Sequence, residues 1–113
     1  MGIEVHKGRG LTKEQALADA TSKGLWVTLQ ESDDTVADTV HWHTWDTHLY
    51  LIEGEYREID PENESLVMEA GDYIVVPART LHAGRATKKS VFVIGLTSEL
   101  FEGQTIRRDP DEL

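Results

Sequence analysis

Four of the five histidines have a spacing that could bring their imidazole rings onto one metal ion. His41 and His43 are one residue apart, His48 follows soon after, and His82 comes after a predicted strand and a proline turn. Side chains alternate between the two faces of a strand, so His41 and His43 point the same way, and a third imidazole from a neighbouring strand would complete a facial ligand set. A His-x-His pair alone is more often an ordinary hydrogen-bonded or solvent-facing pair.

The elements that must position these histidines are short strands. Runs of β-branched and aromatic residues are separated by polar or glycine-containing turns, and this pattern predicts an antiparallel sandwich or barrel. Before them, Thr12 and Gln15 form a capping box that predicts a short helix over about 12–23, ending before Gly24. The predicted strands are Leu25 to Gln30, Thr39 to Trp45, His48 to Glu53 continuing to Ile59, Leu66 to Glu69, Tyr73 to Val76, and Val91 to Leu96.

The histidines and the turns around them resemble the two motifs of the cupin superfamily between Thr35 and Ala86. The resemblance implies an all-β fold, a double-stranded β-helix of the RmlC-like jelly-roll type. It also implies one cupin domain over 1–113, with a barrel core over about 25–97 and a C-terminal tail over about 104–113. The residues that carry it are His41, Trp42, His43, Glu53 and Gly54 for the first motif, and Gly71, Pro77 and His82 for the second.

The sequence departs from the cupin motifs at four positions. Thr35 and Arg79 stand where the motifs have glycine, and Ala86 stands where the second motif has asparagine. The fourth departure affects the site itself, because the glutamate of the first motif is replaced by Thr47 or by His48, depending on how the loop is counted. A one-residue bulge reverses that assignment, so the sequence leaves both alternatives open.

The resemblance implies that His41, His43 and His82 hold a divalent transition metal ion, with His48 as a possible fourth ligand. Two histidines and one carboxylate form the facial triad that suits non-haem Fe(II). A site made only of histidines adds no ligand charge, so the ion keeps its full positive charge and polarises a bound oxygen atom more strongly. Imidazole suits several metals, and the sequence therefore leaves Fe, Mn, Ni, Cu and Zn open.

Several residues near the histidines have two interpretations. Asp46 either orients a ligand imidazole or is a turn residue with an exposed carboxylate. Trp45 either walls a pocket or packs in the core, and Trp42 points to the opposite face from the histidines on either side of it. Tyr50 is interpreted as a core or interface residue rather than a catalytic phenol. Arg79 either clamps a substrate carboxylate at the barrel mouth or forms a surface salt bridge.

Composition excludes several classes of partner and chemistry. The 113 residues include 21 acidic and 11 basic side chains, for a formal net charge of -10, which argues against nucleic acid and anionic membranes as partners. The absence of cysteine removes thiol chemistry, disulfides and iron–sulfur clusters. No apolar stretch reaches the length of a membrane span, so we expect a cytoplasmic protein. Exposed strand edges favour a homodimer.

These observations leave three classes of function open. The first is a metal-dependent enzyme that acts on a small molecule, either a dioxygenase-like oxygenase or an isomerase or lyase. The second is a cupin that binds a small ligand or senses it without turnover. The third is a protein that acts through its surface, with the histidines as a relic. The sequence identifies no substrate and no catalytic residue beyond the predicted metal ligands, because one fold supports many chemistries.

Overall fold

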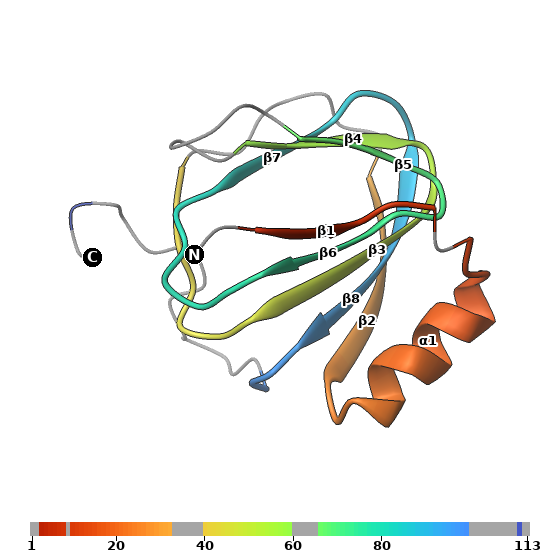
Figure 1. Cartoon of the computed structure of the whole chain (residues 1–113), viewed down its shortest axis with the longest axis horizontal. Coiled ribbons are helices and arrows are strands. Elements are labelled where there is room, and N and C mark those ends of the chain that lie inside the picture. The colour runs from red at the N-terminus through yellow and green to blue at the C-terminus, as the bar shows by residue number, and fades with distance from the viewer. Residues whose placement is uncertain (1–2, 9, 33–39, 60–65, 100–110, 112–113) are drawn as a thin grey trace.

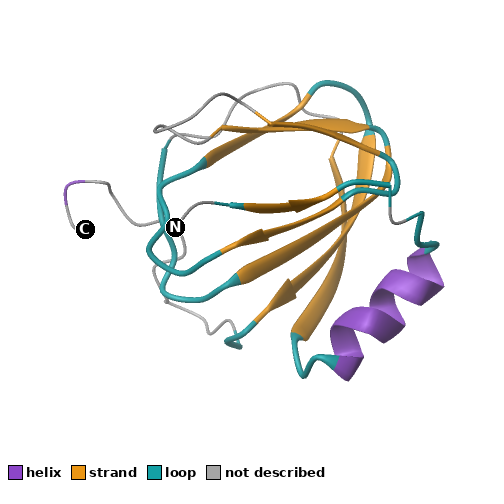
Figure 2. Cartoon of the chain, viewed as in Figure 1, coloured by secondary structure: helices purple, strands orange, loops and turns teal. Residues whose placement is uncertain are grey.

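The structure is a computed structural model that describes residues 3–8, 10–32, 40–59, 66–99 and 111. The described residues form a two-layered β-barrel with one α-helix outside it (Figures 1 and 2). The elements are β1 (Glu4–His6), α1 (Lys13–Ser22), β2 (Trp26–Ser32), β3 (Thr47–Glu53), β4 (Glu55–Ile59), β5 (Leu66–Glu69), β6 (Tyr73–Val76), β7 (Ala83–Ala86) and β8 (Ser90–Leu96).

The strands form two antiparallel sheets that face each other. The five-stranded sheet has the order β1-β6-β3-β8-β2, and the three-stranded sheet has the order β5-β4-β7. The chain passes from the first sheet to the second at Gly54, between β3 and β4. Gly54 has a φ of 99°, and a Cβ there would lie only 2.7 Å from Cα of Ser90, so this crossing requires glycine. The predicted continuous strand from His48 to Ile59 is therefore two strands in different sheets.

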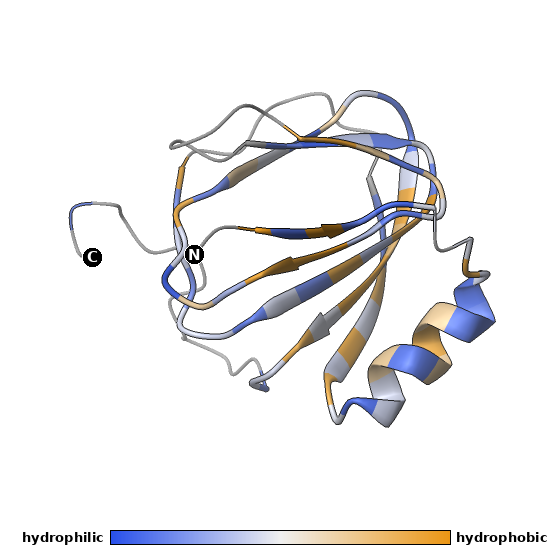
Figure 3. Cartoon of the chain, in the orientation of Figure 1, coloured by the Kyte–Doolittle hydropathy of each residue, from blue (hydrophilic) through white to orange (hydrophobic). Residues whose placement is uncertain are grey.

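The main core lies between the two sheets. Along β3, Leu49 and Leu51 face this core, whereas His48 and Tyr50 lie on the opposite phase and face outward. Tyr56 of the smaller sheet packs edge-on against Phe92 of the larger sheet, with ring centroids 5.1 Å apart. The hydropathy of the strands alternates accordingly (Figure 3). The buried core residues are Leu49, Leu51, Met68, Ile74, Val76 and Phe92.

Helix α1 covers part of the outer face of the five-stranded sheet. Ala16 and Ala20 are fully buried there against Tyr50, Tyr73 and Val93. The helix begins at the predicted capping box: the backbone N–H of Gln15 donates to Thr12 Oγ1 and the N–H of Thr12 donates to Gln15 Oε1. The predicted all-β fold with a short N-terminal helix is confirmed.

The sequence prediction missed two strands and over-assigned another. Strands β1 and β7 were not predicted. The predicted strand from Thr39 to Trp45 is not a regular strand: Thr39 lies outside the described residues, and the described residues of this segment form isolated bridges at His41 and Trp42 instead. The predicted tail over 104–113 also lies outside the described residues except for Asp111. None of the helices in the described ranges has the length and apolarity of a membrane span.

Candidate metal centre

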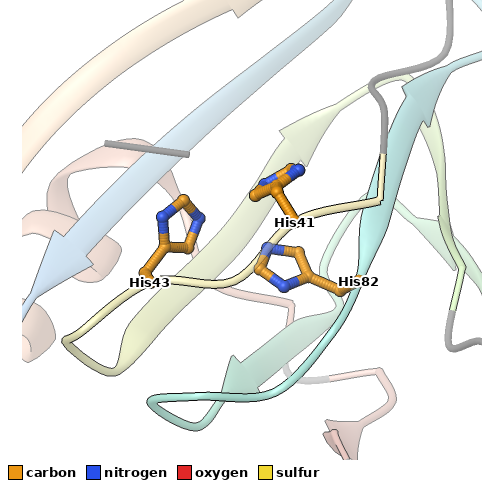
Figure 4. Close-up of side chains that lie close together, drawn as sticks. All are labelled: His41, His43 and His82. Carbon is orange, nitrogen blue, oxygen red and sulfur yellow. The ribbon is translucent and has the colours of Figure 1, made fainter. Parts of the chain in front are cut away.

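Three of the four predicted ligands lie together at one end of the barrel (Figure 4). Each of His41, His43 and His82 offers a ring nitrogen, and these three atoms all lie within 4.8 Å of one another. The ring centroids are 4.9 Å apart for His41 and His43, 4.4 Å for His41 and His82, and 5.0 Å for His43 and His82. His41 and His82 are buried, with 4% and 7% of their surface exposed, whereas His43 is partly exposed. Solvent therefore reaches these rings on the side of His43.

Backbone hydrogen bonds fix two of the histidines as a pair. His41 and His82 form an antiparallel bridge in which each N–H donates to the other's carbonyl oxygen, and both bonds are 2.9 Å long. His82 stands immediately before β7, so this bridge attaches the His41 segment to the three-stranded sheet. The close approach of the two rings is thus set by the main chain rather than by side-chain packing alone.

The ring of His82 is oriented by a further contact. Its Nδ1 lies 2.9 Å from the carbonyl oxygen of Thr80, which can only accept a hydrogen bond. A neutral His82 ring therefore carries its proton on Nδ1 and its lone pair on Nε2. This is the form in which histidine binds a metal, with the other ring nitrogen donating to a backbone carbonyl.

The ring of His43 is held by Trp45. The two rings stack with centroids 5.0 Å apart and an interplanar angle of 13°. Trp45 is 4% exposed, which favours packing over the alternative of an open pocket wall. Trp42, between the two histidines, is equally well buried at 5% exposed. The indole of Trp45 thus limits rotation of the most exposed of the three imidazoles.

The turn that precedes His82 is tied to the same group of histidines. The N–H of Arg79 donates to the carbonyl oxygen of His43 at 2.8 Å, and the N–H of Ala78 donates to Asp46 Oδ1 at 2.7 Å. Asp46 is therefore a turn residue that fastens two loops together. Arg79 has a φ of 64° and is the one non-glycine residue with positive φ in the described part of the chain. Its motif counterpart is glycine, which adopts this conformation without strain.

The structure places Thr47 and His48 on opposite faces of β3. Thr47 takes the inward phase, and its buried Oγ1 has no hydrogen-bond partner among the described residues. His48 takes the outward phase, with Nδ1 at 2.5 Å from the hydroxyl of Tyr73. His48 is therefore not brought to the other three histidines. Burial and the charge of Lys23 lower the pKa of His48 from its ordinary value of 6.5.

His48 belongs instead to a polar network beneath α1. Asp19 Oδ2 accepts hydrogen bonds from the Tyr50 hydroxyl and from Lys23 Nζ, each at 2.7 Å. Lys23 Nζ also lies 3.3 Å from the hydroxyl of Tyr73, and burial together with the bond to Asp19 raises the pKa of Tyr50. Sequence reasoning missed this network, although Asp19 and Lys23 stand four residues apart on one helix face.

The donor set of the three histidines fits a transition metal ion. Three imidazole nitrogens converge, and one ring is already oriented through its other nitrogen by a backbone carbonyl. Imidazole is a ligand for Zn, Cu, Ni and Fe, and three protein ligands leave coordination positions for a small molecule. Within the described ranges, no carboxylate belongs to this set. We call His41, His43 and His82 together the histidine cluster.

The sequence match agrees with the fold. The family model for the cupin domain matches residues 25–97. The chain belongs to the cupin family. The two sheets are therefore those of a cupin jelly roll, and the histidine cluster lies within the matched residues. A search of curated protein sequences finds no match to this cupin.

Solved cupin structures resemble this cupin at low sequence identity, which shows a shared fold. A cupin-2 domain protein from Shewanella frigidimarina is 18% identical, with a TM-score of 0.57, over 65% of this chain and 69% of that one. The polyketide cyclase RemF from Streptomyces resistomycificus is 17% identical, with a TM-score of 0.59, over 73% and 58%. The TDP-quinovose 3,4-ketoisomerase WlaRB from Campylobacter jejuni is 14% identical, with a TM-score of 0.61, over 77% and 72%.

Proposed function

We propose that this cupin is a metal-dependent enzyme of the isomerase or lyase class that acts on a small molecule through the histidine cluster. The observation that carries the proposal is the convergence of three imidazoles, within 4.8 Å, with no carboxylate joining them from the residues that the structure describes. A bound divalent ion would supply Lewis acidity, because uncharged ligands leave its positive charge undiminished for polarising a carbonyl or hydroxyl oxygen. The facial triad of Fe(II) oxygenases includes a carboxylate, so the donor set favours non-oxidative chemistry over oxygenation.

The surrounding residues support this proposal by holding the ligands in place. The bridge between His41 and His82 fixes two of them through the backbone, and Trp45 restrains the third by stacking on His43. Preorganised ligands keep an ion in a geometry that leaves the substrate side open. Two of the similar cupins, a cyclase and a ketoisomerase, are named for reactions of this general kind.

The first experiment is elemental analysis of the untagged protein by mass spectrometry. We expect about one transition metal ion per chain, and we expect the ion to be lost in His41→Ala/His43→Ala. The matched control is His6→Ala/His48→Ala, which removes the same number of imidazoles from the outer face and should retain the metal. Protein that holds no metal and takes up none of Fe, Mn, Ni, Cu or Zn from solution would overturn the proposal.

A second experiment separates catalysis from binding. The metal-loaded protein is incubated with keto acids, diols and phenolic acids, and both product formation and oxygen uptake are followed. Product without oxygen uptake supports an isomerase or lyase, whereas oxygen uptake with product replaces that proposal with an oxygenase. Saturable binding without product would instead assign a ligand-binding or sensor role to the cupin.

We further propose that the protein is a homodimer formed through the edge of β2. In the described part of the chain, β2 pairs only with β8, and Trp26 and Leu29 on it are 53% and 47% exposed. Glu31 is the one charged residue of β2, so repulsion between two copies that pair along this edge is small despite the net charge of -10. Light scattering should give a dimer mass for the wild type and a monomer mass for Leu29→Lys. A monomeric wild type at micromolar concentration would overturn this assignment.

A further inference from the structure

The turn before His82 holds a cation beside the histidine cluster. Arg79 is bracketed by contacts to two of the three histidines: its own N–H donates to the His43 carbonyl, and the carbonyl of the next residue, Thr80, accepts from His82 Nδ1. These bonds, at 2.8 Å and 2.9 Å, fix the backbone of Arg79 at the rim of the cluster. Its long side chain is exposed to solvent.

The backbone conformation of Arg79 is one that glycine adopts freely and that is unfavourable for a long side chain such as arginine. Its φ of 64° lies in the left-handed region, where a Cβ is strained. Strained residues cluster at functional sites, where the side chain has a use that outweighs the cost. The glycine of the cupin motif would give the same turn without strain. What the arginine adds at this position is therefore its guanidinium group.

The guanidinium is not engaged in holding the described part of the fold. The ion pairs of the described residues join His6 to Glu4, Lys7 to Asp72 and Lys23 to Asp19, and none includes Arg79. The nearby carboxylate of Asp46 accepts the Ala78 N–H instead. The surface salt bridge that is the alternative interpretation of Arg79 is therefore not formed within these ranges. A planar guanidinium presents a fork of N–H donors that matches a carboxylate in a bidentate pair.

We infer that Arg79 is a specificity-determining residue of the histidine cluster and that the site takes small molecules that carry a carboxylate. The inference rests on the proposed function, because it assumes that the histidine cluster is where the small molecule binds. The chain has a net charge of -10, which repels anions at long range. A cation at the rim supplies the local attraction that such a ligand needs, and it orients the carboxylate while the rest of the molecule faces the imidazoles.

Calorimetric titration of the zinc-loaded protein with four acids tests the inference. The probes are pyruvate, lactate, oxalate and salicylate, with lactamide and salicylamide as uncharged matches. We expect wild type to bind at least one acid, and we expect Arg79→Gly to weaken that binding about tenfold or more, with the amides unaffected. Arg79→Lys should recover part of the affinity. Arg79→Gly suits the backbone and is therefore expected to fold.

The matched control is Arg85→Gln, which removes the same charge from an exposed arginine on β7 and should leave acid binding unchanged. Failure of wild type to bind any of the four acids, or equal binding by wild type and Arg79→Gly, overturns the inference. The same titration on metal-free protein separates the two proposals. Binding of an acid that depends on Arg79 in a protein that takes up no metal would support the inference and overturn the proposed function. Stoichiometric metal binding, together with acid binding that Arg79→Gly leaves unchanged, would support the proposed function and overturn the inference.

Discussion

The hydroxyl of Tyr73 lies 2.5 Å from Nδ1 of His48, on the face of the five-stranded sheet opposite the histidine cluster. This contact joins β6 to β3, and Lys23 joins both strands to α1, since its Nζ lies 3.3 Å from the same hydroxyl. A tyrosine hydroxyl that accepts from the lysine can donate its own proton only to a neutral His48. The docking of the helix is therefore sensitive to the protonation of a histidine that lies away from the candidate metal centre.

We expect acidification to destabilise the protein through His48. Its pKa in the folded state lies below 6.5, because burial and the charge of Lys23 disfavour its protonated form. The unfolded chain thus binds a proton more readily, so this contribution to stability is complete above pH 6.5 and is lost as the pH falls from there toward the lower folded pKa. Urea denaturation between about pH 8 and pH 5 should show a steeper loss of stability for wild type than for His48→Gln. Parallel curves for the two proteins would contradict this.

Removing the hydroxyl of Tyr50 should loosen the helix. Tyr50→Phe deletes the 2.7 Å hydrogen bond to Asp19 but keeps the ring and its packing. Because the acceptor is a carboxylate, we expect the free energy of unfolding to fall by about 1–2 kcal/mol. A double-mutant cycle with Asp19→Asn isolates the bond, and the double variant should lose less than the sum of the single losses. Additive losses would show that the two side chains are not coupled.

Replacing Trp45 should weaken metal binding without removing a ligand. Trp45→Leu takes away the indole that stacks on His43 at 5.0 Å and frees that ring to rotate. Loss of a group that orients a ligand typically costs about tenfold or more in metal affinity. Competition with a fluorescent chelator measures the effect. Trp42→Leu is the control, since it removes an equally buried indole from the position just before His43; a similar loss of metal affinity in both variants would assign the effect to general destabilisation.

Glycine at position 79 should make the protein more stable. Arg79 adopts a φ of 64°, and relief of left-handed strain is worth about 1 kcal/mol. The urea midpoint of Arg79→Gly should therefore rise at unchanged slope. Arg85→Gly serves as the comparison, because glycine inside β7 lowers stability by about 0.5–1 kcal/mol. A lower midpoint for Arg79→Gly would mean that the arginine side chain contributes to the fold.

The parts of the fold that sequence reasoning predicted are those with local signals. The capping box of Thr12 and Gln15 determines where α1 begins, and β-branched runs mark β6 and β8. The missed strands lack such signals. Strand β7 reads Ala-Gly-Arg-Ala and has no β-branched or aromatic residue. Its glycine is required because Tyr56 of β4 occupies the space that a Cβ at Gly84 would fill. Strand β1 is three residues long and is defined by its pairing with β6.

Part of the candidate site could be predicted because three of its histidines also carry a local signal in the sequence. His41, His43 and His82 follow from spacing and from the motif turns, which survive small errors in strand boundaries. The placement of Thr47 and His48 depends on the residue at which β3 begins, and a shift of one residue reverses it. The partners of His48 come from β6 and α1, which are far away in the sequence, so no local pattern indicates them.

The opposite phases of Thr47 and His48 tie the position of His48 to the core of the barrel. A one-residue slip of β3 would turn His48 inward, but it would also turn Leu49 and Leu51 out of the core, because all side chains of a strand change face together. This strand therefore cannot bring a fourth imidazole to the interior by sliding without losing its apolar packing. The two leucines that hold the sheets together thereby also keep His48 under α1 and away from the histidine cluster.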